Sequence, residues 1–139
     1  MKMSKEEFNA KLIICIELLF SILPLLIIFI LHIALKKNVR EIFTGTDISF
    51  VSVVLFGQTV IKFMSGIAKS DTKKNWQKIA FISSLLFILG IVPAVSFLII
   101  IYTNKEISKI VYVFQSIWFL LAIITYWIIG TIGQMYLDE

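Results

Sequence analysis

Four long apolar runs, separated by short polar stretches, divide this chain of 139 residues. Each run is about as long as the helix that crosses the hydrocarbon core of a bilayer, which takes roughly 20 residues at 1.5 Å per residue. The runs lack the alternation of a membrane β-strand, and such strands need only about ten residues. The sequence therefore predicts an all-α membrane protein, a single transmembrane domain over residues 1–139 with spans at about 12–35, 49–68, 79–102 and 110–137.

The composition argues against a soluble enzyme. Hydrophobic residues make up 59% of the chain and the mean hydropathy is +0.96, whereas soluble domains are about half apolar. The single cysteine, Cys15, allows neither an intramolecular disulfide nor a cysteine metal site. No Gly-rich phosphate loop, His-Glu-x-x-His or Gly-x-Ser-x-Gly pattern occurs. We therefore expect no enzymatic activity, no cofactor and no metal.

The short loops predict the orientation, because cytoplasmic loops carry an excess of Lys and Arg. Seven of these residues precede the first span or lie between the second and third, and five lie in the other two loops. Both termini are thus predicted to be cytoplasmic. The preference for Lys over Arg and the abundance of Ile suit an AT-rich bacterial genome, so we expect a multi-pass protein of the bacterial inner (plasma) membrane.

Two spans contain residues that disturb a helix. Pro24 lies in the middle of the first span, and Gly90 and Pro93 lie close together in the third. Proline removes a backbone donor and crowds the preceding turn, a disturbance that neighbouring helices tolerate within a membrane. Both spans are expected to bend at these positions.

Two charged residues lie inside spans, where charge is costly and usually faces a partner, a cavity or a water path. Glu17 lies six residues past Lys11, and Lys62 lies seven before Lys69. With both termini on one side, the rise of the helix puts the two at nearly equal depth. Three interpretations remain open: an ion pair or polar site between helices, two side chains that reach the nearby interface, and a role in proton or substrate coupling.

The second span also has a polar face, which is unfavourable against lipid. Its members are Ser52, Gln58, Thr59, Lys62 and Gly66. Four helices of one chain leave no room for a hydrated lumen, so one interpretation is a homo-oligomer, for example a tetramer, with this helix lining the axis. The other is that Ser, Thr and Gly allow close helix packing inside one subunit. A stripe of the fourth span, Gln115, Trp118, Ala122 and Thr125, is read as a packing seam.

The linker after the second span is basic. Four lysines, Lys69, Lys73, Lys74 and Lys78, flank or fill it, together with Trp76. Such a segment is typical of a cytoplasmic anchor beside anionic headgroups. Contact with nucleic acid or a nucleotide is the less favoured alternative, although an oligomer would turn the lysines into a basic ring.

Glu17 in the first of four short helices resembles the small multidrug resistance transporters, and that resemblance implies a proton-coupled exporter that uses Glu17. Lys62 departs from that pattern, since it would neutralise the carboxylate. The architecture, without any motif, also resembles small multi-span membrane effectors of bacterial antiphage defence, which implies an oligomer that alters membrane permeability. The leading hypothesis is a homo-oligomeric ion channel or pore-forming effector. The alternatives are the exporter and a non-conducting sensor or scaffold subunit that acts with a cytoplasmic protein encoded by a neighbouring gene.

Overall fold

The computed structural model describes residues 5–35, 44–69, 76–104 and 107–138, and within these ranges the chain is helical and forms no strand. The first span is α1 (Lys5–Ala34) and the second is α3 (Asp47–Lys69). The third comprises α4 (Trp76–Leu86), the π-helical segment η1 (Phe87–Ile91) and α5 (Val92–Thr103). The fourth comprises α6 (Lys109–Thr125), the π-helical segment η2 (Tyr126–Gly130) and α7 (Thr131–Asp138).

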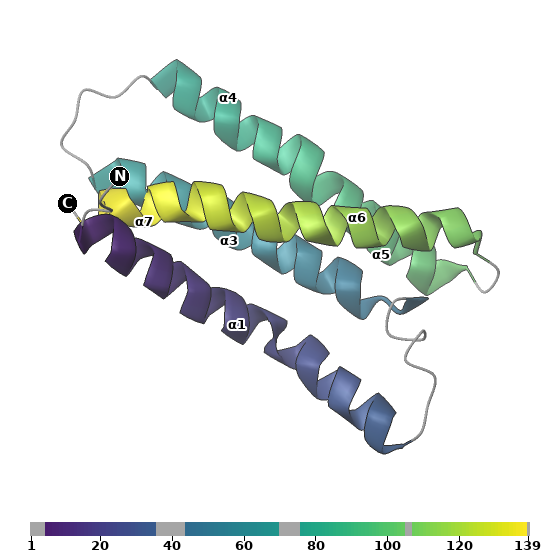
Figure 1. Ribbon diagram of the computed structural model, residues 1–139. Helices are drawn as coiled ribbons and strands as arrows, with labels where there is room; N and C mark the ends of the chain where they lie inside the picture. The colour runs from purple at the N-terminus through teal and green to yellow at the C-terminus, as the bar shows by residue number, and fades with distance from the viewer. Residues whose placement is uncertain (1–4, 36–43, 70–75, 105–106, 139) are drawn as a thin grey trace.

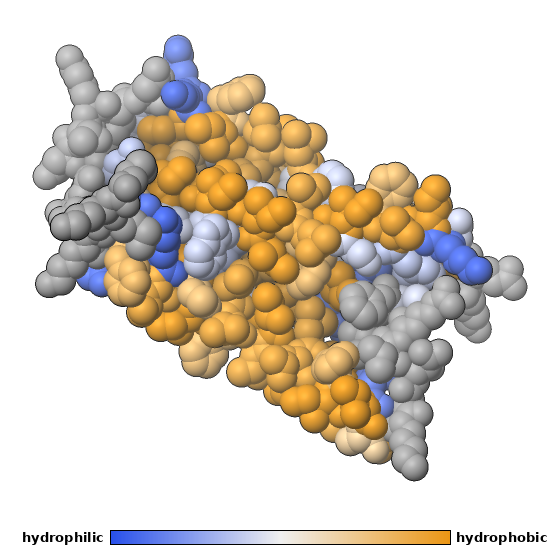
Figure 2. Space-filling model, in the orientation of Figure 1, coloured by the Kyte–Doolittle hydropathy of each residue, from blue (hydrophilic) through white to orange (hydrophobic). Residues whose placement is uncertain are grey.

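All four helical segments are long and apolar enough to cross a membrane, which confirms the predicted all-α fold with four helices of spanning length. The spans run antiparallel, and both ends of the chain lie at the same end of the bundle (Figure 1). Apolar residues cover the middle of the face seen in Figure 2, and hydrophilic residues gather toward the two ends. Large exposed side chains such as Leu19, Phe81 and Ile128 belong to this apolar surface, which suits contact with lipid tails.

The least hydrophobic span occupies the centre of the bundle. α3 packs against α1, against α5 with its π segment, and against α6 and α7. Its buried residues include Val51, Leu55 and Phe56, which join Ile14 of α1 and Tyr126 of η2 in the main core cluster. Helices of the same chain therefore cover most of the polar face of α3.

The predicted disturbance of the third span takes the form of a π segment. The backbone N–H of Val92 donates to the carbonyl of Phe87, a five-residue step that ends just before Pro93. Gly90, inside this segment, packs against the ring of Phe56, and its carbonyl accepts the indole N–H of Trp118 at 3.2 Å. The wider turn thus ties the third span to the second and fourth. In the first span, α1 continues through Pro24.

Candidate functional site

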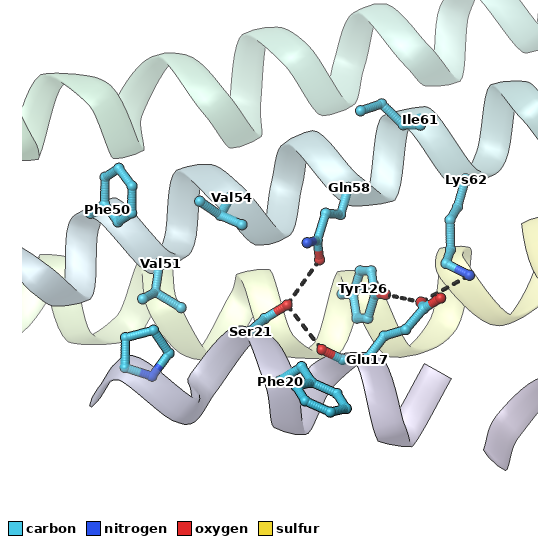
Figure 3. Close-up of a pocket in the computed structure, with 11 residues that line it drawn as sticks. Glu17, Phe20, Ser21, Phe50, Val51, Val54, Gln58, Ile61, Lys62 and Tyr126 are labelled. Atoms are coloured by element: carbon cyan, nitrogen blue, oxygen red, sulfur yellow. Dashed lines mark hydrogen bonds and ion pairs between the residues drawn. The ribbon is translucent and has the colours of Figure 1, made fainter. Parts of the chain in front are cut away.

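An ion pair joins the two charged residues that lie inside the spans. Lys62 Nζ of α3 lies 2.9 Å from Glu17 Oε2 of α1 (Figure 3). The Lys62 side chain is 15% exposed, and that of Glu17 is 39% exposed. Of the three interpretations that the sequence left open, the structure supports a polar site between helices. Equal depth along antiparallel helices is what allows the two side chains to meet.

The fourth span completes the site. The phenol of Tyr126 donates to Glu17 Oε2 at 2.5 Å, and the ammonium of Lys62 donates to Gln134 Oε1 at 2.6 Å. Tyr126 is buried and begins the π segment η2. Each charge therefore has a second, hydrogen-bonded partner, and hydrogen bonds to ionised groups are stronger than those between neutral groups.

Tyr126 and Gln134 were not identified from the sequence. The signal that could have found them is a buried stripe in the fourth span with a spacing of four residues: Ala122, Tyr126, Gly130 and Gln134. Small and polar residues at this spacing are typical of a helix face that packs closely on another helix within a membrane. Nothing in the sequence indicated the π segment η2, because no proline lies near it.

Two glycines bring α3 and α7 close enough for these contacts. A methyl group on Gly66 would clash with the carbonyl oxygen of Gly133, and one on Gly133 would lie 2.7 Å from the carbonyl oxygen of Lys62. Only a glycine pair permits this backbone approach. The approach holds α7 beside the helical turn that carries Lys62, within reach of Gln134.

A second polar layer lies one helical turn deeper. Ser21 follows Glu17 by four residues on α1, and Gln58 precedes Lys62 by four on α3. The Ser21 hydroxyl lies 3.0 Å from both Gln58 Oε1 and the carbonyl oxygen of Glu17. Since α1 and α3 are antiparallel, the same spacing on both helices puts the two layers in register (Figure 3).

These two layers form one wall of a pocket of about 560 Å³ between α1 and α3. The other lining residues are apolar or aromatic: Phe20, Pro24, Phe50, Val51, Val54, Ile61 and Tyr126. The ion pair with Lys62 and the hydrogen bond from Tyr126 both involve Glu17 Oε2. The other carboxylate oxygen, Oε1, has no hydrogen bond within the described part of the chain. The Nε2 amide group of Gln58 likewise makes none with the described residues. The pocket therefore combines an apolar wall with one acceptor and one donor that remain available.

The other residues of the predicted polar face lie elsewhere. Ser52, Thr59 and Gly66 are buried inside the bundle. The two hydroxyls donate to backbone carbonyls four residues earlier, Ser52 to Ile48 at 2.8 Å and Thr59 to Leu55 at 2.7 Å. Such bonds satisfy a hydroxyl without water. For these three residues the structure supports packing within the subunit and not exposure on an axis between subunits, because their cover comes from the same chain.

The seam of the fourth span is a packing surface in part. Gln115 and Ala122 are buried, and Gln115 Nε2 donates to the carbonyl of Gly45 at 2.7 Å. Within the described residues, Gln115 Oε1 and Ser49 Oγ are buried without a hydrogen-bond partner. Neither atom borders the pocket between α1 and α3.

Only part of the basic linker can be placed. Lys73 and Lys74 lie outside the described residues. Lys69 ends α3 and donates to the carbonyl of Leu137, and Lys78 lies exposed in the first turn of α4. Lys69 therefore links the end of the second span to that of the fourth, at the end of the bundle where both chain termini lie.

No protein-family model matches this chain, and no curated protein or solved structure matches it significantly. The fold and the site define the class: a four-helix protein whose helices are long and apolar enough to span a membrane, with a hydrogen-bonded charge pair between α1 and α3.

Proposed function

We propose that the chain is a homo-oligomeric channel or pore-forming protein of a bacterial inner membrane, with both termini in the cytoplasm. The observation that carries this proposal is the exposure of the ion pair on the side of the bundle. Glu17 is 39% exposed beside an open pocket, although it lies well inside its span. A part-exposed carboxylate at this depth is costly against lipid and favourable against water or a second subunit.

The residues that would border a path between subunits differ from those expected from the sequence. In this proposal the α1 and α3 face with the pocket turns toward neighbouring copies, so that Glu17, Ser21, Gln58 and Lys62 meet water. Ser52, Thr59 and Gly66 stay inside each subunit, where they hold the helices together. A ring of neutralised charge pairs would admit water and small ions without strong selectivity for one sign.

Cysteine accessibility tests this arrangement in the intact oligomer. In a Cys15→Ala background, Ser21→Cys and Gln58→Cys should react with a membrane-impermeant thiol reagent, while the matched controls Ser52→Cys and Thr59→Cys on the buried face should not. Liposomes that contain the purified protein should pass ions without an imposed proton gradient. Absence of flux together with unreactive cysteines at positions 21 and 58 would overturn the proposal.

The exporter remains a second proposal on one observation. The lining of the pocket includes both a carboxylate and the aromatic rings of Phe20 and Phe50, a combination suited to hydrophobic cations. Its difficulty is that Lys62 already neutralises Glu17. This proposal requires that Glu17→Gln abolish drug resistance while assembly stays intact, and unchanged resistance would remove it.

A non-conducting sensor or scaffold subunit is the third proposal. The same exposed charge pair could be covered by a helix of another protein instead of a second copy. In that case the purified chain passes no ions and copurifies with a different protein.

The pore proposal includes an effector role in antiviral defence. If the chain has that role, induced expression should collapse the membrane potential of the host cell.

A further inference from the structure

We infer that the pocket between α1 and α3 binds a neutral amphiphile, with the polar end at Glu17 and Gln58 and the apolar part along Phe20, Phe50 and Val54. The polar end carries a group that both donates and accepts a hydrogen bond, such as a hydroxyl. This inference goes beyond the proposed channel, because binding of such a molecule does not require the protein to conduct.

The shape of the pocket separates the two halves of such a ligand. The polar atoms of Glu17, Ser21, Gln58 and Lys62 lie toward one end of the pocket, and Phe50 and Val51 lie toward the other (Figure 3). Seven residues of helix separate Glu17 from Pro24, which corresponds to roughly 10 Å along α1. The volume of about 560 Å³ falls within the range of small-molecule sites.

The available hydrogen-bonding groups match a hydroxyl. Glu17 Oε1 is an acceptor, and the Gln58 amide Nε2 is a donor, and neither is engaged by the described residues. A hydroxyl donates one hydrogen bond and accepts others, so it can donate to Glu17 Oε1 or accept from Gln58 Nε2. A purely apolar molecule would leave both without a partner.

Charge balance selects a neutral ligand. Glu17 and Lys62 sum to zero, and the remaining lining residues carry no charge. A charged ligand would therefore leave one uncompensated charge in a medium of low dielectric, whereas a neutral ligand would not. The same balance disfavours the hydrophobic cation that a lone carboxylate would bind.

The rim of the pocket points to the bilayer as the route of entry. Phe20, Phe50 and Ile61 line the pocket and are also among the most exposed apolar side chains, at 71%, 60% and 65%. Side chains of this kind lie against lipid tails in a membrane protein. An amphiphile dissolved in the bilayer can therefore enter sideways, between neighbouring copies of the proposed oligomer, with its tail still in contact with lipid.

Photo-crosslinking with three probes of equal chain length tests the inference. The full chain in phosphatidylcholine nanodiscs is exposed to diazirine derivatives of decanol, decanesulfonate and decyltrimethylammonium, and the labelled residues are mapped by mass spectrometry. For the wild type we expect decanol to label the pocket roughly tenfold more than either charged probe. A tenfold difference corresponds to a modest free-energy cost of binding one uncompensated charge. Preferential labelling by the cationic probe would overturn the inference. Even labelling of the whole lipid-facing surface would also overturn it.

Charge variants make the test specific, since each probe is compared with itself across variants. Lys62→Met leaves a net negative site and should raise labelling by the cationic probe. Glu17→Gln leaves a net positive site and should raise labelling by the sulfonate. The double variant is neutral again and should restore the preference for decanol. Unchanged preferences across this series would overturn the role of charge balance.

Two further variants keep the test decisive if a single charge variant fails to fold. Val54→Trp fills the pocket without a change of charge and should suppress decanol labelling. Val113→Trp adds the same bulk on the exposed surface of α6, away from the pocket, and should leave the labelling intact. Equal labelling of these two variants would overturn the inference. Ion flux is measured separately, so failure of the channel proposal is distinguishable from failure of this one.

Discussion

Gly66 and Gly133 bring α3 and α7 into backbone contact, because a methyl group on Gly66 would clash with the carbonyl oxygen of Gly133. The obstructing atoms belong to the backbone and cannot rotate away. This contact places the turn with Lys62 beside Gln134, whose side chain accepts a hydrogen bond from the lysine at 2.6 Å. The polar site therefore depends on a pair of residues that have no polar side chain.

Gly66→Ala should destabilise the protein by about 1–3 kcal/mol, because the added methyl group forces two backbones apart. Gly57→Ala is the matched control, since it lies on the same helix and an added methyl group would meet nothing within 4 Å. It should be neutral or stabilising by up to about 1 kcal/mol through helix propensity. Unfolding of the detergent-solubilised protein measures both, and equal stability of the two variants would contradict the close packing of α3 on α7.

Glu17→Gln and Lys62→Met should each destabilise the protein, because each leaves the other charge without its counterion inside the bundle. The double variant should recover part of the loss, with a coupling free energy of about 0.5–3 kcal/mol. Thermal unfolding of the four members of the cycle provides the measurement.

A double-mutant cycle at Glu7 and Lys11 is the control for the cycle at Glu17 and Lys62. Glu7 and Lys11 form a 2.6 Å pair within one turn of α1, near the end of the helix, and their coupling should stay near 0.3–0.5 kcal/mol. Additive effects at Glu17 and Lys62, within a few tenths of a kcal/mol, would mean that these two side chains do not meet.

Tyr126→Phe should destabilise the protein by about 1.5–3 kcal/mol, since it removes a hydrogen bond to a charged group and keeps the ring in the core. The effect should largely disappear in a Glu17→Gln background, because the acceptor is then no longer charged. Tyr102→Phe, at a side chain that is 82% exposed, is the control and should change stability by less than about 0.5 kcal/mol. A Tyr126→Phe effect that persists undiminished with Glu17→Gln would assign the loss to packing instead.

Gly90→Ala should be destabilising by about 1–3 kcal/mol, because a methyl group there would lie 2.5 Å from a ring carbon of Phe56. The obstacle is a side chain, so Phe56→Leu should rescue part of the loss in the double variant. Gly130→Ala is the milder comparison, since its nearest neighbour, at 3.2 Å, is the flexible end of Ile14. Chemical denaturation in detergent ranks the three, and a costlier Gly130→Ala would contradict the packing around η1.

The sequence by itself determined the four spans and the common depth of Glu17 and Lys62. Span length and hydropathy are local properties that follow from bilayer thickness, and the helical rise converts residue numbers into depth. An ion pair between the two residues was therefore one of the interpretations that the sequence alone allowed, and the folded chain forms it.

Only the tertiary structure decided which side of each helix faces a neighbour. Lipid tails are as apolar as a protein core, so hydrophobicity does not distinguish the buried face of a spanning helix from its lipid-facing side. The polar face of α3 accordingly divides in a way that no pattern indicated, with Ser52 and Thr59 inside the bundle and Gln58 and Lys62 at the pocket. The hydrogen bond between Lys62 and Gln134 depends on how closely α7 approaches α3, and the contact between Gly66 and Gly133 sets that distance.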